Sequence, residues 1–195
     1  MDAEQGPLAR LRSATAAAHA DLDTALDVLD RPWDTAVHRR WLELTWGLLA
    51  PLERALAAQA ATDPAALDGA GRARAELVVA DLRALAVPED EVAALAECPD
   101  VPAVPDRAAA LGVRYVLDGS TLGGRLIARA VVAAGVPAAA TTSLTGREGA
   151  GRRWRETTAA LEATGPADVP GMTAAALGTF AAYRAWLAPL ERARA

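Results

Sequence analysis

Three glycines fall within six residues of a segment whose pattern predicts one long helix. They are Gly119, Gly123 and Gly124, all within the run Tyr115–Gly124. A glycine inside a helix costs roughly 0.5–1 kcal/mol relative to alanine, so three of them indicate that a bulky group lies directly against the backbone. Gly119 and Gly123 are four residues apart and share one helix face. The pattern therefore predicts a smooth trough for a flat ligand, with a close crossing of two helices as the alternative.

His19 is the residue best placed to bind a metal ion in such a ligand. It follows three consecutive alanines, and these small neighbours would let a flat ring approach the helix. Thr15 and Arg12 precede His19 by four and seven residues, so all three share one helix face. A neutral imidazole on a rigid helix is a common ligand of heme iron. His19 is therefore a candidate iron ligand, although a single histidine is more often an ordinary surface or core residue.

The other histidine and the single cysteine are weaker candidates. His38 lies beside Arg39 and Arg40, and we expect it to face solvent and not to bind metal. Cys98 precedes Pro99 in a Pro-rich connector, where we expect an inert thiol. A single cysteine excludes an intramolecular disulfide, which fits a reducing compartment.

The histidine segment and the glycine segment together resemble the bacterial biliverdin-producing heme oxygenases. Leu11–Asp23 matches the pattern L-R-x-A-T-x-x-x-H-x-x-L-[DE], and Tyr115–Gly124 matches Y-V-x-[ED]-G-S-x-L-G-G, in the same order. The resemblance implies an all-α, single-domain, heme oxygenase-like helical bundle. In such a bundle heme b lies between an N-terminal proximal helix and a Gly-rich, kinked distal helix, and it is substrate and cofactor together.

The resemblance also implies a reaction. Enzymes of this family cleave heme with O2 to biliverdin, CO and Fe2+, using electrons from an external ferredoxin or reductase. His19 would ligate the iron. The distal helix would supply the catalytic residues on the other side of the ring, which are Gly119, Ser120, Gly123 and Gly124. Animal-type members carry an Asp directly after the first distal glycine, where this chain has Ser120, so the residues that deliver protons stay undetermined.

Heme carries two propionates, and a buried ring needs cationic partners for them. Arg12 matches the basic residue that the family places seven residues before its proximal histidine. Gly151–Arg155 resembles the family's G-x-R/M-W-R-x-F segment and indicates Arg152 and Arg153 as partners, since a guanidinium binds a carboxylate with two parallel hydrogen bonds. Arginines at a helix start are equally often a solvated surface. Further heme contacts are expected from Thr15, Tyr115, Phe180 and Tyr183.

Other classes of protein remain as alternatives. A non-catalytic heme carrier on the same fold would bind heme through His19 without cleaving it, and the missing distal Asp favours this alternative. A non-heme di-iron oxidase would need several E-x-x-H pairs, which the sequence lacks. A thiaminase-like hydrolase would need an activated cysteine in its pocket, and Cys98 in its connector does not suit that role.

Composition and charge narrow the class further. The chain has 195 residues, enough for one domain with its own core. A content of 52% hydrophobic residues, many of them alanine, with only 4% aromatic residues, favours closely packed helices. The net charge of -5 argues against nucleic-acid binding. Because the N-terminus lacks the apolar stretch of a signal peptide and no run of about 18 apolar residues occurs, we expect a cytoplasmic protein that does not bind membranes.

The apolar pattern predicts an all-α bundle in one domain over residues 1–195, with 1–6 as an N-terminal tail. Asp34 is the expected N-cap of the helix that follows it. The spacing of Thr145 and Glu148 predicts a capping box before a later helix. No alternating run predicts a strand. The expected helices span 7–21, 24–30, 34–61, 67–85, 89–97, 104–135, 148–164 and 172–193.

Overall fold

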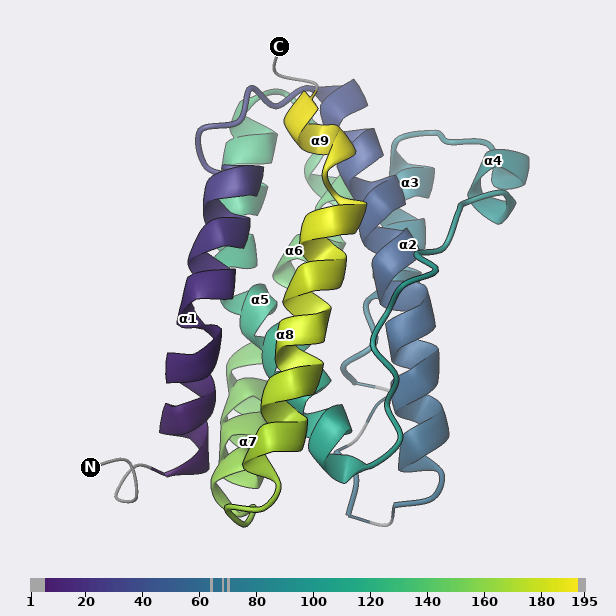
Figure 1. The fold of residues 1–195 in the computed structure, drawn as a ribbon. Coiled ribbons are helices and arrows are strands. Elements are labelled where there is room, and N and C mark those ends of the chain that lie inside the picture. Colours follow the sequence, from purple (N-terminus) through teal and green to yellow (C-terminus); the bar gives the residue numbers. More distant parts are fainter. Residues whose placement is uncertain (1–5, 64, 68, 70, 193–195) are drawn as a thin grey trace.

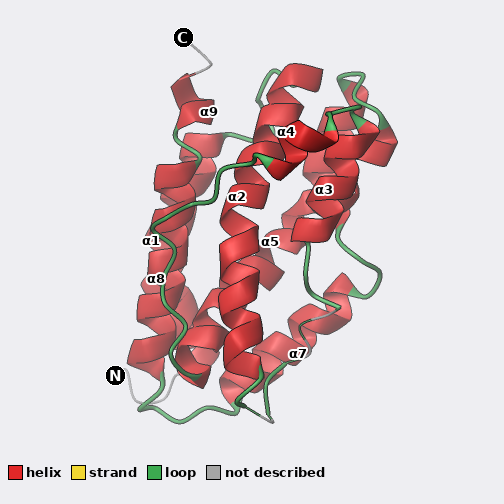
Figure 2. Cartoon of the chain, turned by 90° about the vertical axis from the view of Figure 1, so that its right-hand side faces the viewer, coloured by secondary structure: helices red, strands yellow, loops and turns green. Residues whose placement is uncertain are grey.

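Every regular element that the computed structural model describes is a helix, so the predicted all-α class is confirmed for that part of the chain (Figure 2). The predicted tail lies outside the described residues except for Gly6, which is the N-cap of the first helix. The described residues are 6–63, 65–67, 69 and 71–192. The helices are α1 (Pro7–Leu26), α2 (Thr35–Ala60), α3 (Ala75–Ala84), α4 (Glu89–Ala93), α5 (Arg107–Ala133), the 3-10 helix η2 (Ala138–Ala140), α6 (Thr142–Thr145), α7 (Ala150–Glu162), α8 (Val169–Trp186) and α9 (Pro189–Arg192).

The other helices are arranged around α5. It packs against α8, α7, α6 and α2, while α1 lies on α8 and α7. Figure 1 shows α1 and α8 side by side with α5 behind them. A core of buried apolar side chains joins α1, α5, α7 and α8, and its members include Leu11, Leu111, Leu161, Met172 and Phe180. This core fixes the helix that carries His19 relative to the helix that carries the glycines.

Several predicted helix boundaries are wrong by a turn or more. The separate helix predicted at 24–30 does not exist, because α1 continues to Leu26 and ends at Asp27, whose φ of 44° is left-handed. The helix predicted to begin at residue 67 begins only at Ala75. The C-terminal helix begins earlier than predicted, at Val169.

The two predicted helix caps have different outcomes. Asp34 is confirmed as a cap, since its carboxylate accepts the backbone N–H of Val37 at 2.7 Å. The capping box at Thr145 is wrong. The chain turns through Gly149, whose φ of 86° is left-handed, and α7 begins after it at Ala150 without a side-chain cap.

The short helices η2 and α6 were not predicted, and a distant carboxylate explains why. Asp81, fully buried on α3, accepts the backbone N–H groups of Thr142 and Ser143 at 2.9 and 2.8 Å. It also accepts the Thr142 hydroxyl at 2.6 Å. Such a tertiary cap has no signal in the local sequence, and it holds α6 beside α3.

His38 is buried, so the prediction that it faces solvent is wrong. Its position on α2 places it one turn before the buried Leu42, while the neighbouring Arg40 stays exposed. The His38 Nε2 atom lies 2.7 Å from the carbonyl oxygen of Ala140 and donates to it. Its Nδ1 atom has no hydrogen-bond partner among the described residues. This histidine therefore belongs to the core.

The buried His38 should make the fold sensitive to mild acid. Burial is the main cause that lowers its pKa below 6.5, against smaller opposing effects of the Ala140 carbonyl and Asp81. Below pH 6.5 His38 therefore binds a proton in the unfolded chain but not in the folded chain. The free energy of unfolding falls as the pH falls. We expect the free energy of unfolding to fall by at most about 1.4 kcal/mol per pH unit, the limit for one proton.

Urea denaturation of the wild-type chain and of His38→Gln at pH 7.5, 6.5 and 5.5 measures this effect. The stability difference between the two proteins should shrink toward low pH. The comparison with the variant is needed because burial raises the pKa of Glu53, which contributes the opposite pH dependence at lower pH. A difference that stays constant across this range would contradict the prediction.

Candidate functional site

His19 projects from α1 with one ring nitrogen held in place. Its Nδ1 atom donates to the Asp23 carboxylate at 2.9 Å, four residues later on the same helix. Its side chain is 62% exposed, and among the described residues its one ion-pair contact is made by Nδ1, which leaves Nε2 without a partner. The imidazole edge meets the Phe180 ring with centroids 5.6 Å apart. A carboxylate behind one nitrogen fixes the tautomer and leaves the other nitrogen as a lone-pair donor.

The three glycines of α5 have different surroundings. A Cβ at Gly119 would lie 3.4 Å from the Trp154 ring, and a Cβ at Gly123 would meet nothing within 4 Å. A Cβ at Gly124 would lie 1.7 Å from the carbonyl oxygen of Leu144 on α6. Gly124 therefore permits a close helix crossing, which was the alternative to a ligand trough. Gly123 instead lies on an open surface.

Large apolar side chains extend this open surface of α5. Leu122 and Leu126 are 52% and 54% exposed although both belong to an otherwise well packed helix. Together with Gly119 and Gly123 they follow helical spacing along one side of α5. We call these four residues the apolar strip. Exposed leucines beside a bare backbone are the surface that a flat apolar ligand would cover.

Helix α8 contacts both the His19 side chain and the helix that carries the apolar strip. Phe180 and Tyr183 are one turn apart on α8 and so share a side of that helix. Phe180 contacts His19. Burial raises the pKa of the Tyr183 phenol, and Arg74 and Ser120 lie close enough to oppose that rise. His19 and Ser120 therefore approach the same stretch of α8 from two sides.

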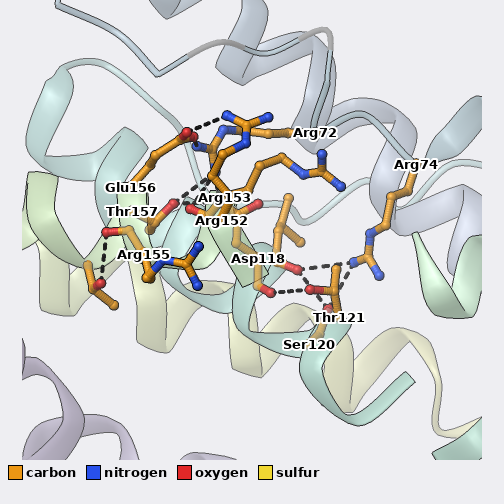
Figure 3. A network of polar contacts seen from close by, with 12 residues as sticks. Arg72, Arg74, Asp118, Ser120, Thr121, Arg152, Arg153, Arg155, Glu156 and Thr157 are labelled. Atoms are coloured by element: carbon orange, nitrogen blue, oxygen red, sulfur yellow. Dashed lines mark hydrogen bonds and ion pairs between the residues drawn. The ribbon is translucent and has the colours of Figure 1, made fainter. Parts of the chain in front are cut away.

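Ser120 and Thr121 bond within their own helix. The Ser120 hydroxyl donates to the Leu117 carbonyl at 2.8 Å, and the Thr121 hydroxyl donates to the Asp118 carbonyl at 2.6 Å. Arg74 lies beside Ser120, and its Nη2 donates to the serine oxygen at 2.9 Å (Figure 3). Ser120 is thus part of a polar network.

Asp118, also on α5, is buried. It forms a buried ion pair with Arg72, whose side chain is 1% exposed, and it accepts the Thr157 hydroxyl at 2.6 Å. Arg72 also pairs with Glu156 at 2.7 Å. Figure 3 shows these residues gathered between α5, α7 and the segment that precedes α3. The network ties the middle of α5 to α7.

The predicted cationic partners lie at several places. Arg12 on α1 is exposed, and Arg152 on α7 is exposed and pairs with Glu156 at 2.5 Å. Arg153 instead donates to the backbone carbonyls of Arg147 and Glu148, at 2.5 and 2.6 Å. Arg153 therefore holds the turn before α7, whereas Arg12 and Arg152 remain accessible to an anionic group.

Thr15 and Tyr115 join α1 to α5 below the strip. Thr15 is buried and donates to the Leu11 carbonyl at 2.8 Å, while its hydroxyl lies 3.5 Å from that of Tyr115. The Tyr115 ring packs on Trp154 with centroids 5.8 Å apart. The structure thus brings His19 and Phe180 together, and it joins Thr15 of α1 to Tyr115 of α5.

Sequence reasoning missed the residues that support this region. Asp23 carried a signal, since a carboxylate four residues after a histidine shares its helix face. Arg72 and Arg74 precede α3, in a segment that was expected to be helical from residue 67. Only the tertiary structure brings them to Asp118 and Ser120. No local signal could have assigned them.

Cys98 has the surroundings of a structural residue. It is buried, and its backbone N–H donates to the Gly47 carbonyl at 2.8 Å. Burial raises the pKa of its thiol, outweighing a hydrogen bond from the Asp100 backbone. A raised pKa reduces the thiolate that a nucleophilic cysteine needs.

Comparison with known proteins identifies no family for this chain. No protein-family model matches the chain, and no curated protein matches it significantly. Within the described residues, no group of three or more His, Cys, Asp or Glu side chains is arranged to hold a metal ion, as a di-iron oxidase would require. None of the described helices has both the length and the apolar character needed to cross a membrane.

Proposed function

We propose that this chain is a heme oxygenase that cleaves heme to biliverdin, CO and Fe2+. One observation carries the proposal. Within the described residues His19 presents an unpartnered Nε2 from α1, with Asp23 behind its other nitrogen, and it contacts Phe180 of α8, the helix that also packs against α5. A histidine ligand on one side and bare helix backbone on the other suit a flat ring with a central metal.

The residues of this region fit heme in shape and charge. The apolar strip offers two exposed leucines and a glycine with open space above it. Arg12 and Arg152 are exposed cations on the flanking helices α1 and α7, and propionates require such partners. Phe180 offers an aromatic wall beside His19.

Each part of the site would have a defined task in the reaction. Heme supplies the oxygen chemistry when it is bound, as substrate and cofactor together. The strip would hold the ring by contact and exclude water from the side opposite His19, which is catalysis by positioning. Electrons would come from a ferredoxin or reductase, because the sequence contains no G-x-G-x-x-G nucleotide motif.

A non-catalytic heme carrier is the second candidate, and Ser120 is the observation that favours it. A carrier needs His19 and the strip but no group that delivers protons. The Ser120 hydroxyl donates to the Leu117 carbonyl, so its hydrogen is bonded within its own helix.

Addition of hemin followed by a reductant in air tests the two candidates against each other. We expect a Soret band on hemin addition, and its decay with release of biliverdin once ascorbate or a ferredoxin system is added. Catalase is included so that peroxide released into solution cannot degrade the ring. A Soret band that persists under reductant supports the carrier, and failure to form any Soret band would contradict both candidates.

A further inference from the structure

A small cleft between α5, α7 and the segment before α3 is lined mainly by arginines. Four guanidinium groups border it, and Asp118 is the single carboxylate that the described residues place in its lining. The four are Arg72 and Arg74 before α3, Arg147 in the turn between α6 and α7, and Arg153 on α7 (Figure 3). The lining of this cleft therefore carries an excess of positive charge.

Most of this charge is not balanced by a buried partner. Arg74 donates to the Ser120 hydroxyl and to a backbone carbonyl, and Arg153 donates to two backbone carbonyls. Neither arginine forms an ion pair with a described residue. Arg147 pairs with Glu76 at 3.1 Å, but Glu76 is exposed, and an exposed pair contributes little.

Arg72 is the buried member of the four. Its side chain is 1% exposed, and its two terminal nitrogens donate to Asp118, Glu156 and Thr157. Its Nε atom is also buried and has no partner among the described residues. A buried donor without an acceptor is unfavourable, and Arg72 lines the cleft. An acceptor bound in the cleft would satisfy this donor.

The first turn of α7 offers further donors to the same cleft. Ala150 begins this helix of 13 residues and lines the cleft. The N-cap, Gly149, has no side chain to accept a hydrogen bond, and the first turn contains no acidic residue. The N–H groups of Ala150, Gly151 and Arg152 therefore have no acceptor among the described residues. Free N–H groups and the helix dipole at such a start attract anions.

We propose that this cleft binds a phosphate group. Phosphate carries nearly two negative charges near neutral pH and presents several strong acceptor oxygens. Its tetrahedral shape suits donors that come from three elements, which are the Arg72 Nε atom, the Arg74 and Arg147 guanidinium groups, and the first turn of α7. This inference involves no heme, so it stands or falls independently of the proposed function.

Equilibrium dialysis of the ligand-free chain against radiolabelled inorganic phosphate tests the site, with chloride keeping the ionic strength constant. We expect saturable binding to the wild-type chain. Ala150→Asp places a carboxylate at the first position of α7, where it takes the donors that phosphate would use. It should weaken phosphate binding by more than about tenfold. An acidic residue at a helix start stabilises the helix, so this variant should fold at least as stably as the wild type.

The arginines of the lining provide a second test. Arg74→Gln and Arg147→Gln should each weaken phosphate binding about tenfold, because a hydrogen bond to a charged group contributes about that much. Arg155→Gln is the matched control. It removes the same charge from α7, but Arg155 is exposed and does not line the cleft. Circular dichroism checks that each variant is folded.

The outcomes decide the proposal and identify the source of the phosphate group. Absence of saturable phosphate binding would overturn it, as would equal affinities of Ala150→Asp and wild type. An equal loss in Arg155→Gln and Arg74→Gln would show only a general effect of charge and would overturn it too. Phenyl phosphate that binds as well as inorganic phosphate would support a phosphate group on a larger molecule, whereas binding of inorganic phosphate alone would support the free ion.

Discussion

Replacement of His19 by alanine is expected to weaken hemin binding by more than about 100-fold and to abolish the Soret band of the ligated complex. Loss of a carboxylate behind a metal ligand already costs about 10- to 100-fold in affinity, and this substitution removes the ligand itself. Spectrophotometric titration with hemin measures the effect. The His19 side chain is 62% exposed, so its removal leaves the fold intact.

The chain provides sharp controls for this result. It has two histidines, and the other is buried on α2, so His38→Gln should keep the Soret band of the wild-type complex. Asp23→Asn keeps His19 as the ligand and weakens only the hydrogen bond that its Nδ1 atom makes with residue 23. Its hemin affinity should lie between those of the wild type and His19→Ala. Added imidazole should restore the spectrum of His19→Ala by occupying the space of the lost ring. Equal hemin affinity in His19→Ala and wild type would refute the assignment.

Replacement of Gly124 by alanine is expected to destabilise the fold by about 3 kcal/mol or more, the upper range for overpacking. The new Cβ would lie 1.7 Å from the Leu144 carbonyl oxygen. That oxygen belongs to the backbone of α6, which Asp81 holds in place, so it cannot move aside cheaply. Urea denaturation followed by circular dichroism measures the loss.

Gly123→Ala is the matched control, one residue away in the same helix. Its Cβ would meet nothing within 4 Å, so alanine should stabilise the helix by about 0.5–1 kcal/mol through its higher helix propensity. The two substitutions are chemically identical, and their opposite effects would come from surroundings alone. Equal stability of the two variants would show that α6 does not press on α5 as described.

The sequence predicted the long helices because their signals are local. Asp34 starts α2, and apolar spacing carries α5 through three glycines. His38 was misassigned because its neighbours in the sequence are charged, while its burial depends on the carbonyl of Ala140, about a hundred residues away.

The candidate site shows the same division between local and distant signals. Spacing places Gly119 and Gly123 on one face, but it cannot tell an open surface from the contact that Gly124 makes with α6. The pairing of Asp23 with His19 follows from helix geometry. The approach of Arg74 to Ser120 depends on the non-helical segment before α3, which was expected to be helical, and could not be inferred from the sequence.

The leucines of the apolar strip are large apolar side chains that the fold leaves uncovered. Leu122 and Leu126 are both more than half exposed to water. A ligand that covers them would complete the core and add its own binding free energy to folding, about 2.7 kcal/mol at a ligand concentration of one hundred times Kd. Ligand supply would then set the lifetime of the protein as well as its occupancy, because the empty chain is the form that opens, aggregates and is degraded first.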